Sequence, residues 1–489
     1  MSAPLLDALD RVHGPAALPG YDPAAHGVGI LHLGIGAFHR AHQAVASDDA
    51  LARSGGDWRI TGVSLRSREV AEALGPQHGL YTLIERGAAG TKARVIGAIR
   101  DVIAADPGRV LAAMSDPAIR IVTLSVTEKG YGIDRAARAA DPAHPAVAAD
   151  LADPGHPSGV LGLICAALAA RHAAGIAPFT VLSCDNLPEN GALLRDGVLD
   201  FARRTRPDLA GWIAENVAFP SSMVDRITPA ATPETLAEAT RQTGCTDLAA
   251  IETEPFMQWV IEDHFPQGRP DWEAGGAIFV RDVAPYERMK LTMLNGSHSM
   301  LAYAGFLSGH RYVRDVMGDP ALAALVRRHL QAAAQVLPVL EGIALADYAA
   351  DLEARFQNPA IAHETWQIAM DGTEKLPQRI FQPALAALEA GQDPRPFAFA
   401  TAAWMRYALG VTDRGEGYAL RDPRESEIRA TLAGIARNAG VISAALHGLP
   451  GLFPQRLAHD PAWRDAVETA LAAMLAEGMA QAIRQEARA

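Results

Sequence analysis

Short apolar runs alternate with amphipathic stretches through the first half of the chain. The runs are rich in Val, Ile and Leu, as buried strands are, and the stretches between several of them carry Ala and Leu at helical spacing. Strands that alternate with helices indicate an α/β fold built on a parallel, doubly wound sheet of the Rossmann type. We predict strands at residues 29–33, 59–65, 80–85, 93–99, 120–126 and 179–183, and helices at 41–52, 159–172 and 192–203.

The pattern changes near residue 285, after a last predicted strand at 277–283. Beyond that point Ala and Leu recur at helical spacing with little strand character. We therefore predict a dinucleotide-binding domain over residues 1–285 and a mainly α-helical substrate and catalytic domain over 286–489. The predicted helices of the second domain are 320–336, 383–390, 396–409, 425–436 and 461–488, and the Ala- and Pro-rich stretch 136–157 of the first is expected to be a surface excursion.

Composition excludes several classes of protein. With 489 residues, 49% of them hydrophobic and 20% charged, the chain is long enough for two packed domains. The net charge of −12 and the lack of a long basic run argue against nucleic-acid binding. The N-terminus lacks the features of a secretory signal, and the longest apolar run, 160–170, is too short to span a bilayer. Three widely spaced cysteines indicate reduced thiols, so we expect a cytoplasmic protein.

A glycine pair follows the first predicted strand directly. Gly34 and Gly36 stand where a dinucleotide-binding turn has one glycine for the turn and one for close approach to a pyrophosphate. His39 stands in place of the third glycine, so the fingerprint is incomplete. His39 and His42 have the spacing of metal ligands, but no Cys or carboxylate cluster accompanies them and we expect no metal. The predicted cofactor-binding residues of this turn are Gly34, Ile35, Gly36, Ala37 and Phe38.

The segment 290–298 brings an amine, an amide and an imidazole into nine residues that are otherwise mostly apolar. On an α-helix, Asn295 and His298 share one face and Lys290 lies two turns before His298, roughly 80° round the axis. A proton donor and two polarising groups around one point suit the reduction of a carbonyl or the oxidation of an alcohol. A helix start with an exposed lysine and a packing histidine is the alternative interpretation.

Six motifs in a fixed order carry a family resemblance. The chain resembles the polyol-specific long-chain dehydrogenases, which include mannitol 2-dehydrogenase and fructuronate reductase (D-mannonate oxidoreductase). The resemblance covers roughly residues 25 to 480, and it implies a metal-independent, nicotinamide-dependent enzyme that acts on a ketose or keto-uronate. The motifs are GIGAFHRAHQ at 34–43, SVTEKGY at 125–131, SCDN at 183–186, MVDRI at 223–227, EPFMQW at 254–259, and Lys290, Asn295 and His298 at their spacing.

The resemblance implies catalytic roles for three of these side chains. Lys290 would be the general acid in reduction and the general base in oxidation. A free lysine titrates near pH 10.4, so burial, or a nearby cation such as protonated His298, must make it a better base. Asn295 and Asn186 would be the amide pair that hydrogen-bonds the reacting oxygen as negative charge develops on it.

Three further residues would support them. His298 would bind a neighbouring hydroxyl and orient the substrate, and Glu287 would relay protons. Asp225 would accept hydroxyl protons or hold one of these groups in place. Simpler interpretations stay open for each group. Residues 185–186 could form an ordinary turn after a strand, and Asp225 with Arg226 a surface ion pair. Glu287 and Lys290 have the i,i+3 spacing of a salt bridge on one helix.

The choice of cofactor depends on the end of the second predicted strand. NAD-binding folds usually carry an acidic residue there for the ribose 2′-hydroxyl, but this chain has Arg66 and Ser67, which could hold a 2′-phosphate. The resembled family favours NAD, so we predict NAD and leave NADP open. Ser125, Val126 and Thr127 follow a predicted strand and are expected on the nicotinamide side.

The substrate is predicted from one departure within the family. Gln367 stands where mannitol-type members carry an arginine, and Lys375 and Arg379 follow in a segment more like that of fructuronate reductase. Either cation could pair with a uronate carboxylate, or both could be ordinary helix-start cations. We predict fructuronate and D-mannonate as the substrate pair, with mannitol and fructose as the close alternative. A non-catalytic NAD-binding sensor is the remote alternative, and we expect a monomer.

Overall fold

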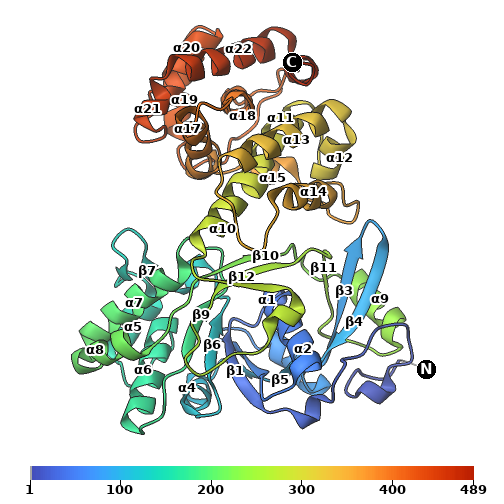
Figure 1. Ribbon diagram of the computed structural model, residues 1–489, viewed down its shortest axis with the longest axis vertical. Coiled ribbons are helices and arrows are strands. Elements are labelled where there is room, and N and C mark those ends of the chain that lie inside the picture. Colours follow the sequence, from blue (N-terminus) through green and yellow to red (C-terminus); the bar gives the residue numbers. More distant parts are fainter. Residues whose placement is uncertain (1–2) are drawn as a thin grey trace. The chain divides into compact units, whose positions relative to one another are not determined.

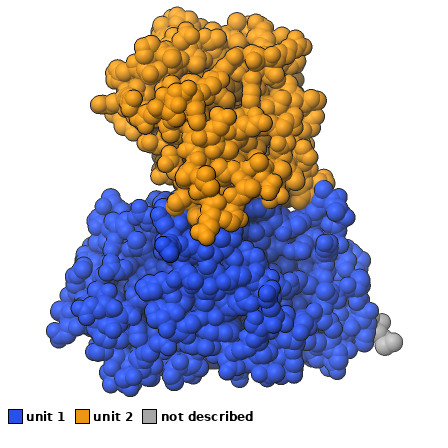
Figure 2. Space-filling view, in the orientation of Figure 1, with its two compact units in different colours: residues 1–284 blue, residues 285–489 orange. Residues whose placement is uncertain are grey.

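The computed structural model describes residues 3–489. The chain divides into two compact units, residues 1–284 (unit 1) and 285–489 (unit 2), which Figure 2 colours blue and orange. Each unit has its own secondary structure and its own apolar core, and each is described by itself below.

Unit 1 is built on a five-stranded parallel sheet with the strand order β5-β2-β1-β6-β9 (Figure 1). This order reverses direction between β1 and β6, the arrangement that opens a crevice at the carboxyl ends of the strands. The predicted α/β class with a doubly wound parallel sheet is therefore confirmed. The strands are β1 (Val28–Leu33), β2 (Arg59–Ser64), β5 (Ile99–Ala104), β6 (Ile121–Leu124) and β9 (Thr180–Ser183).

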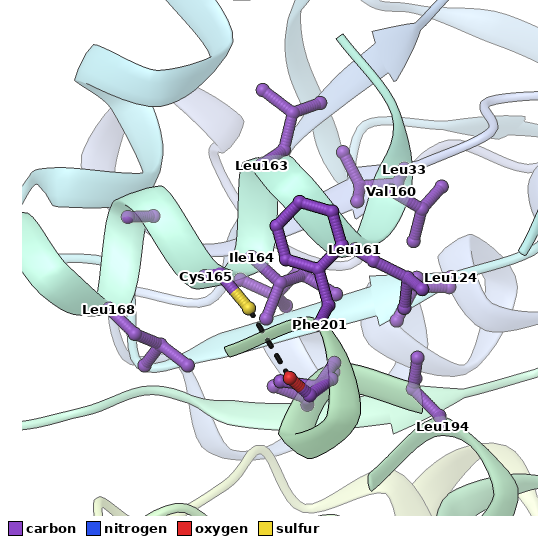
Figure 3. Close-up of a cluster of buried hydrophobic side chains, with 14 of the residues drawn as sticks. Leu33, Leu124, Val160, Leu161, Leu163, Ile164, Cys165, Leu168, Leu194 and Phe201 are labelled. Atoms are coloured by element: carbon purple, nitrogen blue, oxygen red, sulfur yellow. Dashed lines mark hydrogen bonds between the residues drawn. The ribbon is translucent and has the colours of Figure 1, made fainter. Parts of the chain in front are cut away.

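Alternating side chains of these strands enter two separate cores, because successive residues of a strand face opposite sides of a sheet. Leu31 and Leu33 of β1 pack into one core, whereas Ile30 packs into the other. Figure 3 shows the first core, where side chains of β1 and β6 meet those of the helices 160–173 and 190–205. Cys165 lies in it as a small apolar residue, and all three cysteines are free and buried.

Two predicted strands belong to a different sheet. The runs at 80–85 and 93–99 form an antiparallel hairpin, β3 (Tyr81–Gly87) and β4 (Gly90–Ile96), which joins β11 (Ile251–Thr253) in a three-stranded sheet. After β4 the chain turns at Gly97 and continues as β5, the edge strand of the main sheet, which the apolar pattern did not predict. The prediction that the run at 93–99 is one strand of the parallel sheet is wrong.

A third sheet has the strand order β10-β12-β13, and its first two strands overlap the motifs at 223–227 and 254–259. Its strands are β10 (Ser222–Asp225), β12 (Gln258–Glu262) and β13 (Ala277–Val280), of which only the last was predicted. The stretch 136–157 is not a plain surface excursion. It contributes to the small hairpin of β7 (Ile133–Asp134) with β8 (Ala139–Ala140), and it contains a helix, α5 (Pro145–Ala152).

The helix predicted at 41–52 corresponds to one helix of the structure, shifted by two residues, and a separate short helix precedes it. The chain forms α1 (Ala37–Ala41), breaks at His42, whose φ of −126° and ψ of −86° are not helical, and continues as α2 (Gln43–Ser54). The other helices of unit 1 are α3 (Glu69–Leu74), α4 (Pro107–Ser115), α6 (Val160–Ala173), α7 (Asn190–Thr205), α8 (Pro207–Asn216) and α9 (Pro233–Thr243), with short 3₁₀ turns at Leu9–Arg11, Pro23–Ala25, Gly75–Gln77, Glu128–Gly130 and Trp272–Gly275.

Unit 2 is helical, as predicted. Its centre is α18 (Arg395–Ala408), whose residues from Phe397 to Ala408 are all buried, a pattern typical of a core helix. The remaining helices are α10 (Ala284–Met289, which begins at the boundary), α11 (Gly296–Leu307), α12 (Val313–Gly318), α13 (Pro320–Gln335), α14 (Leu345–Phe356), α15 (Thr365–Ala369), α16 (Gly372–Leu376), α17 (Gln382–Glu389), α19 (Glu425–Leu432), α20 (Ala439–His447), α21 (Gln455–Ala458), α22 (Pro461–Glu477) and α23 (Met479–Glu486).

Two predicted helices of unit 2 differ from the structure. The stretch 461–488 is broken at Gly478, whose φ of +82° is not helical, and Asp413 accepts a hydrogen bond (2.7 Å) from the first amide of α23. The helix predicted at 425–436 ends at Leu432. No helix within residues 3–489 combines the length and the apolar character that a membrane crossing requires.

Candidate active site

A cavity of about 780 Å³ opens in unit 1 at the carboxyl ends of β1, β2 and β6. This is where a doubly wound sheet binds its ligand. Of the nine residues predicted to bind a cofactor, seven line the cavity: Gly34, Ile35, Gly36, Arg66, Ser125, Val126 and Thr127. Ala37 and Phe38 do not line it. They begin the short α1, and the Phe38 ring packs against His42, with ring centroids 5.1 Å apart.

The turn after β1 depends on glycine at one position and leaves space at the other. Gly34 has a φ of +95°, and a Cβ there would lie 2.2 Å from the carbonyl oxygen of Ser125 on the neighbouring strand end. Gly36 has extended backbone, and a Cβ there would meet nothing closer than 3.8 Å. Gly34 therefore closes the turn, while Gly36 leaves its backbone accessible from the cavity side.

His39 takes the place of the third glycine by stacking on His32 of β1. The two rings are nearly parallel, at 15°, with centroids 3.4 Å apart, and both residues are fully buried. Burial lowers the pKa of His32 to about 3, so its ring is neutral and can hydrogen-bond Ser125 Oγ (2.8 Å) through Nε2. Ser125 Oγ also donates to the Gly34 carbonyl (3.0 Å), which ties the turn to the end of β6.

Asn186 and Asp225, the predicted catalytic residues of unit 1, follow β9 and end β10. A buried residue that the sequence analysis did not single out, Asn190, joins these two strands. Its amide donates to the carbonyls of Asp185 (3.0 Å) and Ser222 (2.7 Å), and its oxygen accepts from the Ser222 amide (2.9 Å). Residues 185–186 do form a bend after a strand, and Asn190 fixes that bend.

The interpretation of Asp225 and Arg226 as a surface ion pair is wrong, because both residues are buried. The Arg226 guanidinium binds the Glu85 carboxylate and donates to the carbonyl of Ala41 at the end of α1 (2.6 Å) and to that of Glu254 (3.1 Å). One arginine thus connects three of the six sequence motifs. Its role could not be predicted, since its partners lie up to 185 positions away along the chain.

The predicted catalytic segment of unit 2 is not the regular α-helix that we expected. Lys290–Asn295 forms a π-helix between α10 and α11, so the offset of 80° between Lys290 and His298 does not apply. A second π-helix, Pro377–Phe381, contains Arg379 and packs against the first. Gly296 allows this approach, because a Cβ there would lie 2.8 Å from the Arg379 carbonyl oxygen. Such π-helical turns are frequent at functional sites.

His298 lies buried in α11 among rings and cations. Its ring centroid is 4.7 Å from that of Phe356 and 5.3 Å from that of His363. Burial, the His363 ring and the charges of Arg355 and Arg379 hold the pKa of His298 well below its ordinary value. His298 is therefore neutral near pH 7, and the idea that its positive charge assists Lys290 is wrong. Lys290 itself is buried.

The two predicted substrate cations lie in this same part of unit 2. Arg379 is half-buried, and within residues 3–489 its guanidinium has one hydrogen-bond partner, Ser299 Oγ at 3.4 Å. Lys375 Nζ donates to the Met370 carbonyl (2.7 Å) and lies 3.4 Å from the Asp371 carboxylate. Burial and the charge of Arg379 lower the pKa of Lys375. Lys375 thus lies near a carboxylate, whereas the hydrogen-bond partner of Arg379 is an uncharged hydroxyl.

The described residues contain no group of three or more His, Cys, Asp or Glu side chains that could hold a metal ion. His39 and His42, the spaced pair of the sequence analysis, are engaged elsewhere. His39 stacks on His32, and His42 Nε2 hydrogen-bonds the Gln258 carbonyl (3.0 Å).

Two models of known protein families match this chain. Residues 28–274 match the mannitol dehydrogenase Rossmann domain, and residues 282–475 match the mannitol dehydrogenase C-terminal domain. The chain belongs to the mannitol dehydrogenase family. The resemblance carried by the six motifs is therefore confirmed.

Individual members of the mannitol dehydrogenase family match nearly the full length of this chain. The D-mannonate oxidoreductase of Escherichia coli (strain K12) is 43% identical over 479 residues, 96% of this chain and 98% of that protein. The structure of Pseudomonas fluorescens mannitol 2-dehydrogenase in ternary complex with NAD and D-mannitol is 37% identical, with a TM-score of 0.79 over 99% of both chains. A D-sorbitol dehydrogenase in substrate-free form is 35% identical, with a TM-score of 0.91 over 99% of this chain and 100% of that one. This family member is accordingly a dehydrogenase that acts on the CH–OH group of a polyol or sugar acid.

The two glycines of the turn generate a matched prediction. Gly34→Ala should lower the free energy of unfolding by about 1–3 kcal/mol from the backbone conformation alone, with the contact at Ser125 adding to the loss. Gly36→Ala should change it by less than about 1 kcal/mol, because the backbone there is extended and the space is open. Urea denaturation followed by circular dichroism measures both. Equal destabilisation by the two substitutions would contradict this account of the turn.

Proposed function

We propose that the protein is an NAD-dependent oxidoreductase that interconverts fructuronate and D-mannonate, with Lys290 as the general acid and base. The observation that carries the proposal is the state of Arg379. It is a half-buried guanidinium beside the buried, neutral His298, and among the described residues its one hydrogen bond is a long contact with Ser299. A polyol offers no anion to such a cation, whereas a uronate or aldonate brings a carboxylate that a guanidinium can bind through two hydrogen bonds.

The cavity of unit 1 suits a dinucleotide. Its glycine turn leaves the Gly36 backbone open to a pyrophosphate, and Ser125, Val126 and Thr127 form the wall that would face the nicotinamide. The related P. fluorescens enzyme is known in a ternary complex with NAD and D-mannitol. When bound, the nicotinamide supplies or accepts the hydride. Every other task in the reaction falls to side chains of the protein.

The protein's side chains would transfer the proton, stabilise charge on the reacting oxygen and orient the substrate. In reduction, Lys290 Nζ gives a proton to the carbonyl oxygen of the keto-uronate, and in oxidation it removes the hydroxyl proton of the sugar acid. Asn186 and Asn295 donate amide hydrogens to the same oxygen, which are worth most when that oxygen is negatively charged. The neutral His298 ring binds a neighbouring hydroxyl, Asp225 accepts hydroxyl protons, and Glu287, one turn before Lys290, relays protons.

Mannitol 2-dehydrogenase activity is the second candidate, because the related P. fluorescens enzyme, which has a similar length and fold, forms a ternary complex with D-mannitol. An NADH-oxidation panel with fructuronate, tagaturonate, fructose and xylulose separates the candidates. Faster turnover of fructose than of fructuronate would replace our assignment with the neutral polyol. A wild-type protein that binds NADH but turns over no substrate of the panel would favour the non-catalytic sensor.

The cofactor preference follows as a prediction. Arg66 and Ser67 line the cavity at the end of β2 and would tolerate a 2′-phosphate, yet we expect NADH to be preferred, as in the related complex with NAD. The measurement is kcat/KM for NADH and for NADPH with saturating fructuronate. A preference for NADPH of more than tenfold would overturn the assignment of NAD.

Removal of the proposed acid–base group is the test of mechanism. Lys290→Ala should lower kcat by roughly 100-fold or more, while the Kd of NADH changes little, since the residue lies outside the cavity of unit 1. Lys92→Ala, at an exposed position of β4, is the matched control and should leave both values unchanged. Near-normal turnover by the Lys290 variant would end its assignment as the proton donor.

The substrate class is tested through charge. Arg379→Gln should lower kcat/KM for fructuronate by about 10- to 150-fold, because a charge-assisted contact of about 1.5–3 kcal/mol is lost. The weaker turnover of fructose should hardly change, because fructose has no carboxylate. Arg327→Gln, which removes a surface ion pair with Glu353, serves as control. If the Arg379 variant lost both activities equally, the residue would have a general positioning role.

A further inference from the structure

The carboxylate of Asp185 lies at the centre of three hydrogen bonds that tie the end of β9 to the loop after β6. Oδ2 accepts from the amide of Val126 (2.9 Å) and from the Tyr131 hydroxyl (2.7 Å). Oδ1 accepts from the amide of Thr127 (3.0 Å). Asp185 does not line the cavity of unit 1, but Val126 and Thr127 do. The Asp185 carboxylate therefore supports Val126 and Thr127, which form part of the cavity wall, without lining the cavity itself.

The wall needs holding because Thr127 has an unfavourable backbone conformation. Its φ is +67° and its ψ is 158°, a combination that is rare for any residue with a branched Cβ. Such conformations cost on the order of 1–3 kcal/mol and persist only where the surroundings enforce them. Two hydrogen bonds hold the Thr127 backbone: its amide donates to Asp185 (3.0 Å), and its carbonyl accepts from the Gly130 amide (2.9 Å). The bond to Asp185 is the one that ties Thr127 to the end of β9.

The pattern of donors suits an ionised carboxylate. The amides of Val126 and Thr127 can only donate, and when the Tyr131 hydroxyl also donates to Asp185, its oxygen can accept from the Ser183 hydroxyl (2.6 Å). Burial raises the pKa of Asp185, and the hydrogen bonds from Tyr131, Val126 and Thr127 oppose that rise by stabilising the charge. An asparagine in its place would present an amide hydrogen to at least one of the donors.

The backbone of Asp185 is connected to the strand that carries Asp225. Its carbonyl accepts from the buried Asn190 side chain, which also binds Ser222 at the start of β10. The next residue after Asp185 is Asn186, one of the two proposed amide donors to the reacting oxygen. A single residue therefore connects the cavity wall with the strand ends that carry Asn186 and Asp225.

We propose that Asp185 is a positioning residue that holds the cofactor-binding wall at Val126 and Thr127 in a fixed relation to Asn186. The proposal rests on the proposed function, because it assigns the wall to the nicotinamide side of the cofactor. It adds a residue that touches neither cofactor nor substrate and acts on both through its neighbours.

The direct test is Asp185→Asn, a change of charge and of one acceptor without a change of size. We expect the Kd of NADH, measured by fluorescence titration, to rise roughly 5- to 150-fold, the cost of leaving a buried donor unpaired. We expect kcat with fructuronate to fall as well, because Asn186 is displaced. Asp196→Asn is the matched control, since it neutralises an aspartate of the same unit whose ion pair with Arg138 lies on the surface. It should leave Kd and kcat unchanged.

A double-mutant cycle with Thr127→Gly separates positioning from a general loss of stability. Glycine adopts the φ of +67° without strain, so Asp185→Asn should raise the Kd of NADH by a smaller factor in the Thr127→Gly background than in the wild type. A purely structural role of Asp185 would give the same factor in both backgrounds, and that result would overturn the proposal. Tyr131→Phe, which removes one of the three hydrogen bonds, should raise Kd by a smaller factor than Asp185→Asn.

The outcomes for this inference and for the proposed function are distinct. If wild-type protein does not bind NADH, the assignment of the cofactor fails. If the wild type binds NADH and Asp185→Asn binds it equally well, only the role of Asp185 fails. Should Asp185→Asn not fold, Tyr131→Phe decides the question, because it keeps both amide contacts and an aromatic ring, and an unchanged Kd in that variant would refute the proposal.

Discussion

The contact between Gly34 and the backbone of Ser125 is the constraint on which the candidate cofactor site depends. It lies between β1 and β6, where the strand order reverses and the sheet opens. No side chain fits between the two strand ends, so the turn passes directly over the end of β6. The neutral His32 ring hydrogen-bonds the Ser125 hydroxyl, which donates to the Gly34 carbonyl and so fixes the turn. The glycine turn and the wall at 125–127 are in this way two sides of one rigid edge.

Both units contain buried histidine rings that carry no charge. His32 and His39 in unit 1 and His298 in unit 2 are kept neutral by burial, so they serve as stacking surfaces and hydrogen-bonding groups. Constant positive charge in the proposed substrate region comes instead from Arg379, since a guanidinium keeps its proton over the physiological range of pH. A site built in this way keeps its affinity for an anion constant where a histidine-based site would lose it as the pH rises.

The sequence predicted those parts of the structure that depend on local pattern. The buried runs of β1, β2, β6 and β9 and the long helices α6, α7, α13 and α18 lie close to their predicted places. The edge strand β5 was missed because Arg100 and Asp101 interrupt its apolar run, and the β3–β4 hairpin was assigned to the wrong sheet because periodicity does not identify a strand's partner. Asp185, Asn190 and Arg226 have their roles through hydrogen bonds to residues that are 28 or more positions away along the chain. No local sequence pattern reveals such distant partners.

The paired π-helices of unit 2 have a consequence for how such an enzyme can change its substrate. A π-helical turn holds one residue more than an α-helical turn, so each segment can be regarded as an α-helix with a single residue inserted. Loss of one residue from Pro377–Phe381 would restore the regular repeat and rotate Arg379 relative to Ser299 and His298, while the flanking helices α16 and α17 kept their own hydrogen bonds. Insertions and deletions of single residues, as well as substitutions, are therefore a route by which evolution or a designed library could redirect the charge of Arg379.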